Sequence, residues 1–378
     1  MFLKPFLQWN VLLLSALVIG GCTTALPPHD TLKNAMNKTF DLNGYNYTSS
    51  TRITKIAFPE DTNATSEEEK TASDKLTSLY LQKGIDVIRG FSFGLNGAIN
   101  YAGGIQSEAT YDLHYNKDNV EISMKFPFLF DYSTKTLYMG RTFLNTIFPL
   151  KPEDEGKMIR FDLNDSIIST VIGEDSMKQF DEKTVHSINA AMKEGVIKAF
   201  SDINASSFSY QPLNALEKNS GSTKKVHLSL DRNQSVKMIM TITDAMIQKM
   251  YSESVITKEI YGSYMVLSDP KQLAPLIEAL NLQLDFDFGI GSDDHIVYIQ
   301  SAINASDKNE RFVLGIENTT SLENFNAPKF SLDPKRSGSI EYIKVFSDWK
   351  NLFPSEPETD PLADLAQLSD LNEDDNIK

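Results

Sequence analysis

The stretch Phe91-Ser-Phe-Gly-Leu-Asn-Gly-Ala-Ile-Asn-Tyr101 alternates between apolar and small or polar residues along its whole length. Every odd position except Gly97 carries an aliphatic or aromatic side chain, and every even position is small or polar. Successive side chains of a β-strand point to opposite faces of the sheet, so this period of two predicts a strand. The stretch therefore indicates a sheet with one buried and one wet face.

The alternation continues along the chain that follows this strand. Residues 110–115 and 120–130 both alternate, and the polar residues 116–119 between them predict a hairpin. A short strand at 136–139 would extend it. Strands that follow one another without helical crossovers pair antiparallel, so residues 31–165 are expected to form an N-terminal α+β domain around an antiparallel sheet. The remaining elements expected in this domain are a strand at 44–58 and helices at 30–38 and 74–89.

The second half of the chain has a similar order of elements. Residues 282–290 alternate as residues 91–101 do, the turn Gly291–Asp294 follows, and residues 296–303 form a returning strand. The similar order suggests two similar halves, with a C-terminal α+β domain at 166–353. The other elements expected there are helices at 185–200, 235–250 and 270–280 and strands at 208–210, 226–230, 311–317 and 329–332. The fold class predicted for the chain is α+β, with curved antiparallel sheets packed against a few helices.

The N-terminus has the composition of an export signal. Lys4 supplies a basic start, residues 11–19 are almost entirely apolar, and two glycines precede Cys22. The apolar centre is roughly nine residues long, well short of the ~20 needed for a membrane-spanning helix. We expect residues 1–21 to be a signal peptide and residues 22–30 to be a linker.

The residues Ile19-Gly-Gly-Cys22 resemble the lipobox of bacterial lipoproteins. The resemblance implies cleavage before Cys22, the only cysteine of the chain, and attachment of a diacylglyceryl group to its thiol and of an acyl chain such as palmitate to its amino group. Several acyl chains would anchor the protein stably. Thr23 stands where lipoproteins retained in the inner membrane tend to have aspartate, which implies the outer membrane of a Gram-negative cell, facing the periplasm. Cleavage after Ala25, with Cys22 unmodified, and a free buried cysteine are the alternatives.

The chain is acidic and ends in an acidic tail. Loss of the signal peptide, whose only charge is Lys4, would change the formal net charge from -15 to -16. This balance disfavours nucleic acid and bare anionic lipid as partners, because both are bound through clustered Lys and Arg. Residues 354–378 are rich in Asp, Glu and Pro and are expected to be a disordered tail. Leucines recur there at every third position from Leu362 to Leu371, a stripe that either docks on a partner or stays in solvent.

The sequence contains no motif typical of a catalytic or metal site. The histidines are scattered and form neither an i, i+4 pair nor a cluster with cysteine: His29, His114, His186, His227 and His295. No metal, cofactor or enzyme activity is therefore expected. Asp285 and Asp287 alternate with apolar residues and are expected on the wet face of their strand, where paired carboxylates would otherwise allow acid–base chemistry. Asp293-Asp294-His295 is expected to be the apex of a loop between two strands.

Two classes of function agree with these patterns. In the first, the lipoprotein binds a hydrophobic ligand or an envelope component between apolar sheet faces. The candidate lining residues are the aromatic and aliphatic side chains of the alternating strands: Phe91, Phe93, Leu95, Phe126, Phe128, Phe130, Leu284, Phe286 and Phe288. The same side chains would otherwise fill an ordinary core. In the second class, a structural or adaptor lipoprotein engages envelope proteins through its acidic tail or sheet edges and has no ligand cavity.

The order of helices and long alternating strands resembles that of the LolA and LppX type of periplasmic carrier. In those proteins a curved antiparallel sheet forms a half-open barrel and wraps helices around an apolar cavity. The resemblance implies a hydrophobic ligand for this chain. It rests on the pattern of elements alone, so it assigns no ligand-binding residue.

Overall fold

The computed structural model describes residues 26–58, 83–85, 87–117, 119–140, 151–165 and 180–345. Four features predicted from the sequence lie wholly or mostly outside these residues: the signal peptide, Cys22, the acidic tail and the helix at 74–89. The described residues include the long strands of both predicted halves.

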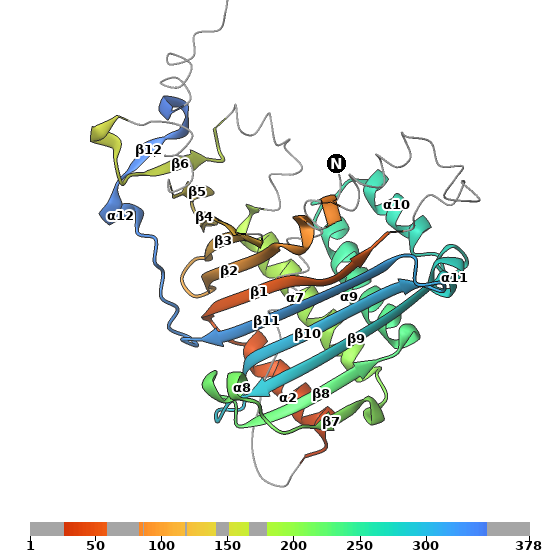
Figure 1. The fold of residues 1–378 in the computed structure, drawn as a ribbon. Helices are drawn as coiled ribbons and strands as arrows, with labels where there is room; N and C mark the ends of the chain where they lie inside the picture. Colours follow the sequence, from red (N-terminus) through yellow and green to blue (C-terminus); the bar gives the residue numbers. More distant parts are fainter. Residues whose placement is uncertain are drawn as a thin grey trace, which may run out of the picture.

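The described strands form one open, curved sheet of twelve strands (Figure 1). In chain order they are β1 (Gly44–Ala57), β2 (Phe91–Asn100), β3 (Gln106–Lys117), β4 (Val120–Asp131), β5 (Thr136–Met139), β6 (Met158–Asp162), β7 (Phe208–Tyr210), β8 (Lys224–Leu230), β9 (Leu280–Ile290), β10 (Ile296–Asp307), β11 (Val313–Glu323) and β12 (Ser339–Glu341). Across the sheet their order is β12-β6-β5-β4-β3-β2-β1-β11-β10-β9-β8-β7. All neighbours are antiparallel except β12 and β6. The predicted α+β class with a curved, mostly antiparallel sheet is confirmed.

Three long helices pack over β7 to β10 on one face of this sheet: α2 (Pro28–Phe40), α7 (Glu182–Ser201) and α9 (Arg232–Ser252). We call this face the helix face and the opposite one the outer face. The shorter helices are α8 (Ala215–Asn219), α10 (Lys258–Leu267), α11 (Pro270–Ala279) and α12 (Pro334–Ser337), with single 3-10 turns at Pro152–Asp154 and Ala205–Ser207. Among the described residues, no helix combines the length and the apolar character needed to cross a bilayer.

The strand register places both apolar stripes on the same face of the sheet. Leu95 lies opposite Ser49 of β1, and this row of cross-strand neighbours continues through Thr320 and Ile299 to Phe288. Residues in one such row share a face because side chains alternate with a period of two. The helix face therefore carries Phe91, Phe93 and Leu95 together with Leu284, Phe286 and Phe288.

The two halves share this sheet and repeat the same order of strands. β1 and β8 are each followed by a long connection and then by three antiparallel strands. The sheet order β4-β3-β2-β1 is thus repeated as β11-β10-β9-β8, which supports two similar halves at the level of topology. The halves join where β1 pairs with β11, and α2 packs against α7, β7 and β8. The domain boundary near residue 165 stays a prediction.

The sequence prediction is wrong at residues 329–332, which form no strand. Side chains bind the backbone amides there instead. Asn46 accepts a hydrogen bond from the first of these amides, and the Glu108 carboxylate accepts from those of Ser331 and Leu332. Amides satisfied in this way need no strand partner. The pattern also misses α10, in which a central glycine and two β-branched residues weaken the helical signal.

Candidate functional site

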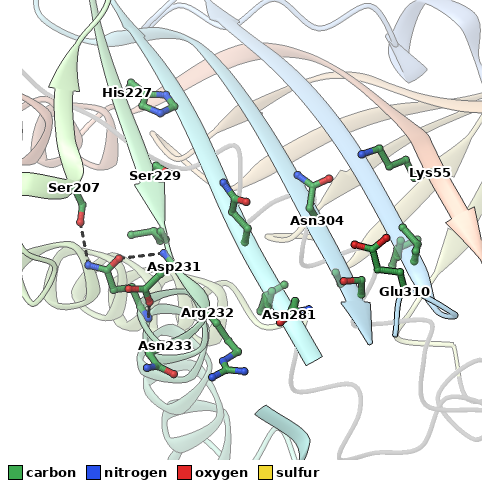
Figure 2. A pocket seen from close by; sticks show the side chains of 18 of the residues that line it. Lys55, Ser207, His227, Ser229, Asp231, Arg232, Asn233, Asn281, Asn304 and Glu310 are labelled. Carbon is green, nitrogen blue, oxygen red and sulfur yellow. Dashed lines mark hydrogen bonds between the residues drawn. The ribbon is translucent and has the colours of Figure 1, made fainter. Parts of the chain in front are cut away.

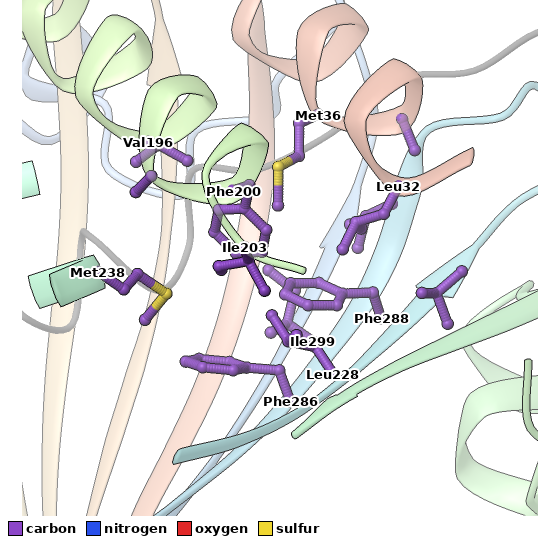
Figure 3. Close-up of a cluster of buried hydrophobic side chains, with 14 of the residues drawn as sticks. Leu32, Met36, Val196, Phe200, Ile203, Leu228, Met238, Phe286, Phe288 and Ile299 are labelled. Carbon is purple, nitrogen blue, oxygen red and sulfur yellow. The ribbon is translucent and has the colours of Figure 1, made fainter. Parts of the chain in front are cut away.

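Over β8, β9 and β10, the helix face forms a close-packed core. Leu284, Phe286 and Phe288 are all buried there, and Phe288 is completely so. They belong to a cluster that includes Met36 of α2 and Phe200 of α7 (Figure 3). This stripe therefore fills an ordinary core, which leaves the stripe of the first half as the candidate lining.

A strip of buried polar side chains crosses the helix face beside this core. Asn318 donates hydrogen bonds to the hydroxyl oxygens of Ser49 and Thr51, at 2.8 Å each, and accepts one from Thr320 at 3.1 Å. These polar groups can stay buried because they satisfy one another. The strip lies on β1 and β11, so it separates the core of the second half from the apolar residues of β2 to β4.

The apolar residues of the first half are only partly covered. Leu95 is buried in a small cluster with Tyr47. Toward the other end of the strands, Phe93, Val120 and Ile122 keep 46%, 48% and 48% of their surface exposed. The open apolar patch, as we call it, consists of these three residues and their half-buried neighbours on the same face: Phe91, Leu113, Tyr115 and Met124.

Ring contacts order the aromatic part of the open apolar patch. Phe91 stacks on Phe93 with ring centroids 6.4 Å apart, and it packs against Tyr115 at 5.0 Å. The aromatic residues of β4 continue the same face towards its covered end, half-buried at Phe126 and Phe128 and buried at Phe130. The patch is thus an ordered apolar surface that is partly in contact with solvent.

The outer face carries a polar cleft of about 1180 Å³ (Figure 2). Residues of β1, β8, β9, β10 and β11 line it, together with the first turn of α9. Most of the lining side chains are hydroxyl, amide or charged groups, among them Lys55, Ser207, His227, Ser229, Asp231, Arg232, Asn281, Gln283, Asn304 and Glu310. Such a surface can hydrogen-bond a polar ligand.

A chain of charged side chains holds His227 at this cleft. Lys225 Nζ lies 2.7 Å from both Glu217 Oε1 and Asp287 Oδ2, and Asp287 Oδ1 lies 2.7 Å from His227 Nδ1. Glu217 is completely buried and shares reciprocal capping bonds with Asn214 at the start of α8. Burial would lower the pKa of Lys225, but its hydrogen bonds to Asp287 and Glu217 raise that pKa above its ordinary value. An ionised carboxylate only accepts, so Nδ1 donates and Nε2 is the acceptor atom of a neutral His227 ring.

Asp285 and Asp287 lie on the outer face and are partly exposed, as their alternation predicts, and neighbouring side chains bind both of them. Asp287 is held by Lys225 and His227. Asp285 accepts hydrogen bonds from Ser229 at 2.6 Å and from the side-chain amide of Gln283 at 3.0 Å. Most of these partners come from β8, which the sequence around the two aspartates does not show.

The other histidines lie on separate elements: His29 on α2, His114 on β3, His186 on α7 and His295 before β10. Within the described ranges, no group of three or more His, Cys, Asp or Glu side chains is gathered as metal ligands would be. Asp293-Asp294-His295 forms the predicted loop apex between β9 and β10, where Asp294 pairs with Lys224 at 3.0 Å.

Comparison with known proteins identifies no family for the chain. No family model matches it, and no curated protein matches it. Among solved structures, the chain is similar to LprF from Mycobacterium bovis, with 12% sequence identity, a TM-score of 0.34, and coverage of 81% of this chain and 96% of that one. A TM-score this low supports no inference about a ligand, so the candidate sites rest on the residues described above.

Proposed function

We propose that this chain is a lipid-anchored periplasmic protein that binds a hydrophobic ligand on the open apolar patch. The observation that carries the proposal is the exposure of Phe93, Val120 and Ile122 on the same face as the buried core. Large contiguous apolar patches on soluble proteins mark surfaces that a partner or ligand covers. Covering such a surface is favourable by about 25 cal/mol per Å² of apolar area removed from water.

The shape of the open apolar patch favours an elongated ligand such as an acyl chain. Its side chains come from three adjacent strands and form two cross-strand rows, Phe93–Leu113–Met124 and Phe91–Tyr115–Ile122. On each strand, the residue in one row is two positions from the residue in the other row. Side chains two positions apart lie on the same face, so the two rows are neighbours on the helix face. A chain of methylene groups lying between the rows would contact both.

The ligand proposal predicts that Phe93→Ala weakens the binding of an apolar probe about tenfold, because the ring contributes roughly 1.5–3 kcal/mol when fully covered. A fluorescent fatty acid titrated into protein made without residues 1–22 measures the affinity. Met265→Ala is the matched control, since Met265 on α10 is 47% exposed and Phe93 is 46% exposed. Absence of saturable binding to the unchanged protein, or an equal loss in both variants, would contradict the proposal.

The anchor proposed at Cys22 is supported by the export signal and by the lipobox-like residues that precede it. Cys22→Ser is expected to abolish incorporation of radioactive palmitate and to release the protein from membranes, because the chain has no other cysteine to accept lipid. Membrane fractionation on a sucrose gradient also tests the proposed outer-membrane location. A Cys22→Ser protein that still takes up palmitate and sediments with membranes would rule out this anchor.

An adaptor function is the second candidate, and α10 favours it. Met265, Val266 and Leu267 at the end of this helix are all exposed and apolar, so a partner protein of the envelope could cover them. If the adaptor function is correct, Val266→Asp should abolish cross-linking to that partner in cells, while Phe93→Ala should leave it unchanged. The reverse pattern favours the ligand.

A further inference from the structure

We infer that the edge strand β7 and the helix α8 that follows it, residues Tyr210–Lys218, face the membrane to which the protein is anchored; we call these residues the β7 edge. The inference rests on the proposed anchor at Cys22 and adds the orientation of the folded body. The partner is a phospholipid bilayer surface. Three observations carry it: where the chain enters the fold, how little chain separates that point from Cys22, and which side chains the edge exposes.

The chain enters the described fold at the β7 edge. The carbonyl oxygen of Leu26 accepts a hydrogen bond of 2.7 Å from the Tyr210 hydroxyl, which also lies 2.6 Å from Thr31 Oγ1. The ring of His29 packs edge-on against Phe208, with centroids 5.0 Å apart. These contacts hold Leu26 and the start of α2 beside β7.

Leu26 is only four residues after Cys22. An extended chain spans at most ~3.6 Å per residue, so the two Cα atoms are no more than about 14 Å apart. Acyl chains on Cys22 would insert into the bilayer and hold that residue at its surface. Leu26 would then lie within about 14 Å of the bilayer surface whatever path the linker takes, and Tyr210 of β7, which binds the Leu26 carbonyl, would lie beside it.

The edge exposes side chains that suit a bilayer surface. Leu216 keeps 64% of its surface exposed and Tyr210 keeps 43%, and Lys218 on α8 is also exposed. Tyrosine is amphipathic and is enriched at membrane interfaces, and lysine can pair with lipid phosphate. Glu217, between Leu216 and Lys218, is completely buried and bound to Lys225. This ion pair fixes α8 to the sheet while Leu216 faces solvent.

The proposed orientation directs the open apolar patch away from the membrane. β2 lies six strands from β7 in the sheet, and strands ~4.8 Å apart place it roughly 29 Å from that edge along the sheet. Figure 1 shows α2, β7 and α8 toward one end of the sheet and β6 and β12 at the other. In this orientation the patch exchanges its ligand with the periplasm and does not touch the membrane that holds the anchor.

The test places one fluorescent label on each surface of the acylated full-length protein. Cys22 is the only cysteine, and its thiol would be occupied by lipid, so Leu216→Cys and Ile122→Cys each introduce a single reactive thiol. Both positions are already exposed, so neither substitution disturbs the core. The proteins are labelled with a nitrobenzoxadiazole dye and reconstituted into phosphatidylethanolamine–phosphatidylglycerol vesicles that contain a nitroxide-labelled lipid. We expect the label at position 216 to be quenched at least threefold more than the label at position 122.

Flotation with the vesicles separates the two possible failures. A protein that does not float overturns the anchor and the orientation with it. A protein that floats, but whose label at position 216 is quenched no more than the label at position 122, overturns the orientation alone. Leu216→Cys combined with Cys22→Ser is the control, and it should neither float nor be quenched.

Discussion

Replacement of Lys225 by methionine is expected to lower the free energy of unfolding by about 3–5 kcal/mol, the range for removing one partner of a buried ion pair. The Lys225 side chain is 11% exposed, and its ammonium group lies between Glu217 and Asp287. Methionine has a similar length but no charge, so the completely buried Glu217 would lose its counter-charge. Urea unfolding followed by circular dichroism measures the change.

The neighbouring residue supplies the matched control. Lys224 is 45% exposed and pairs at 3.0 Å with Asp294, whose side chain is 10% exposed, so Lys224→Met should cost less than Lys225→Met, because the Lys224 ammonium group is already largely in water. The double variant Lys225→Met with Glu217→Leu removes the lysine and the completely buried carboxylate, leaving Asp287 beside His227, and should regain part of the lost stability. If Lys224→Met and Lys225→Met lower the free energy of unfolding equally, the burial of the Lys225–Glu217 pair adds nothing to its effect on stability. Since Glu217 also fixes α8, Lys225→Met should reduce the quenching of a label at position 216.

Phe288→Ala is expected to destabilise the protein by about 3–5 kcal/mol, whereas Phe93→Ala should cost about 1 kcal/mol or less. Both phenylalanines lie on the helix face, but Phe288 is fully buried in the core that packs against the helices and Phe93 lies in the open apolar patch. Removal of the Phe288 ring leaves a cavity in a close-packed core. The Phe93 ring already contacts water, so its loss creates no enclosed void.

This comparison separates stability from ligand binding. We expect the Phe93→Ala protein to unfold at nearly the same urea concentration as the unchanged protein and to bind the fatty-acid probe about tenfold more weakly. This result would assign ligand binding to the open apolar patch. If Phe93→Ala costs as much stability as Phe288→Ala, the open apolar patch is core and the ligand proposal fails.

The local sequence is sufficient to find most of the strands and the face that each of their side chains takes, but it misses β6 and β12. Strands at 136–139 and 208–210 have the predicted bounds. The bounds of β1, β2, β4 and β9 lie close to their predictions, whereas β3, β10 and β11 are longer than predicted. Asp285 and Asp287 also lie on the predicted face. These features are predictable because the period of two is a property of the extended backbone, whatever covers the strand.

The candidate sites are less predictable, because they depend on contacts between distant segments. The polar cleft combines residues of β1 with residues of β8, β9, β10 and β11. The Lys225 ion pairs join α8, β8 and β9. No short motif connects these residues, so only the strand register and the position of α8 show that they meet. The backbone of residues 329–332 is a similar case, since Asn46 and Glu108 bind its amides from far along the chain.

The sequence by itself determined where most strands of this protein lie and which side chains of a strand share a face, with β6, β12 and residues 329–332 as the exceptions. Only the tertiary structure decided which part of the apolar face is core and which is open. Phe93 and Phe288 follow the same alternating pattern, but α2, α7 and α9 pack over β8 to β10 and bury Phe288, while Phe93 stays exposed. The physical reason is that alternation is set by the backbone of a single strand, whereas burial depends on helices that come from elsewhere in the chain.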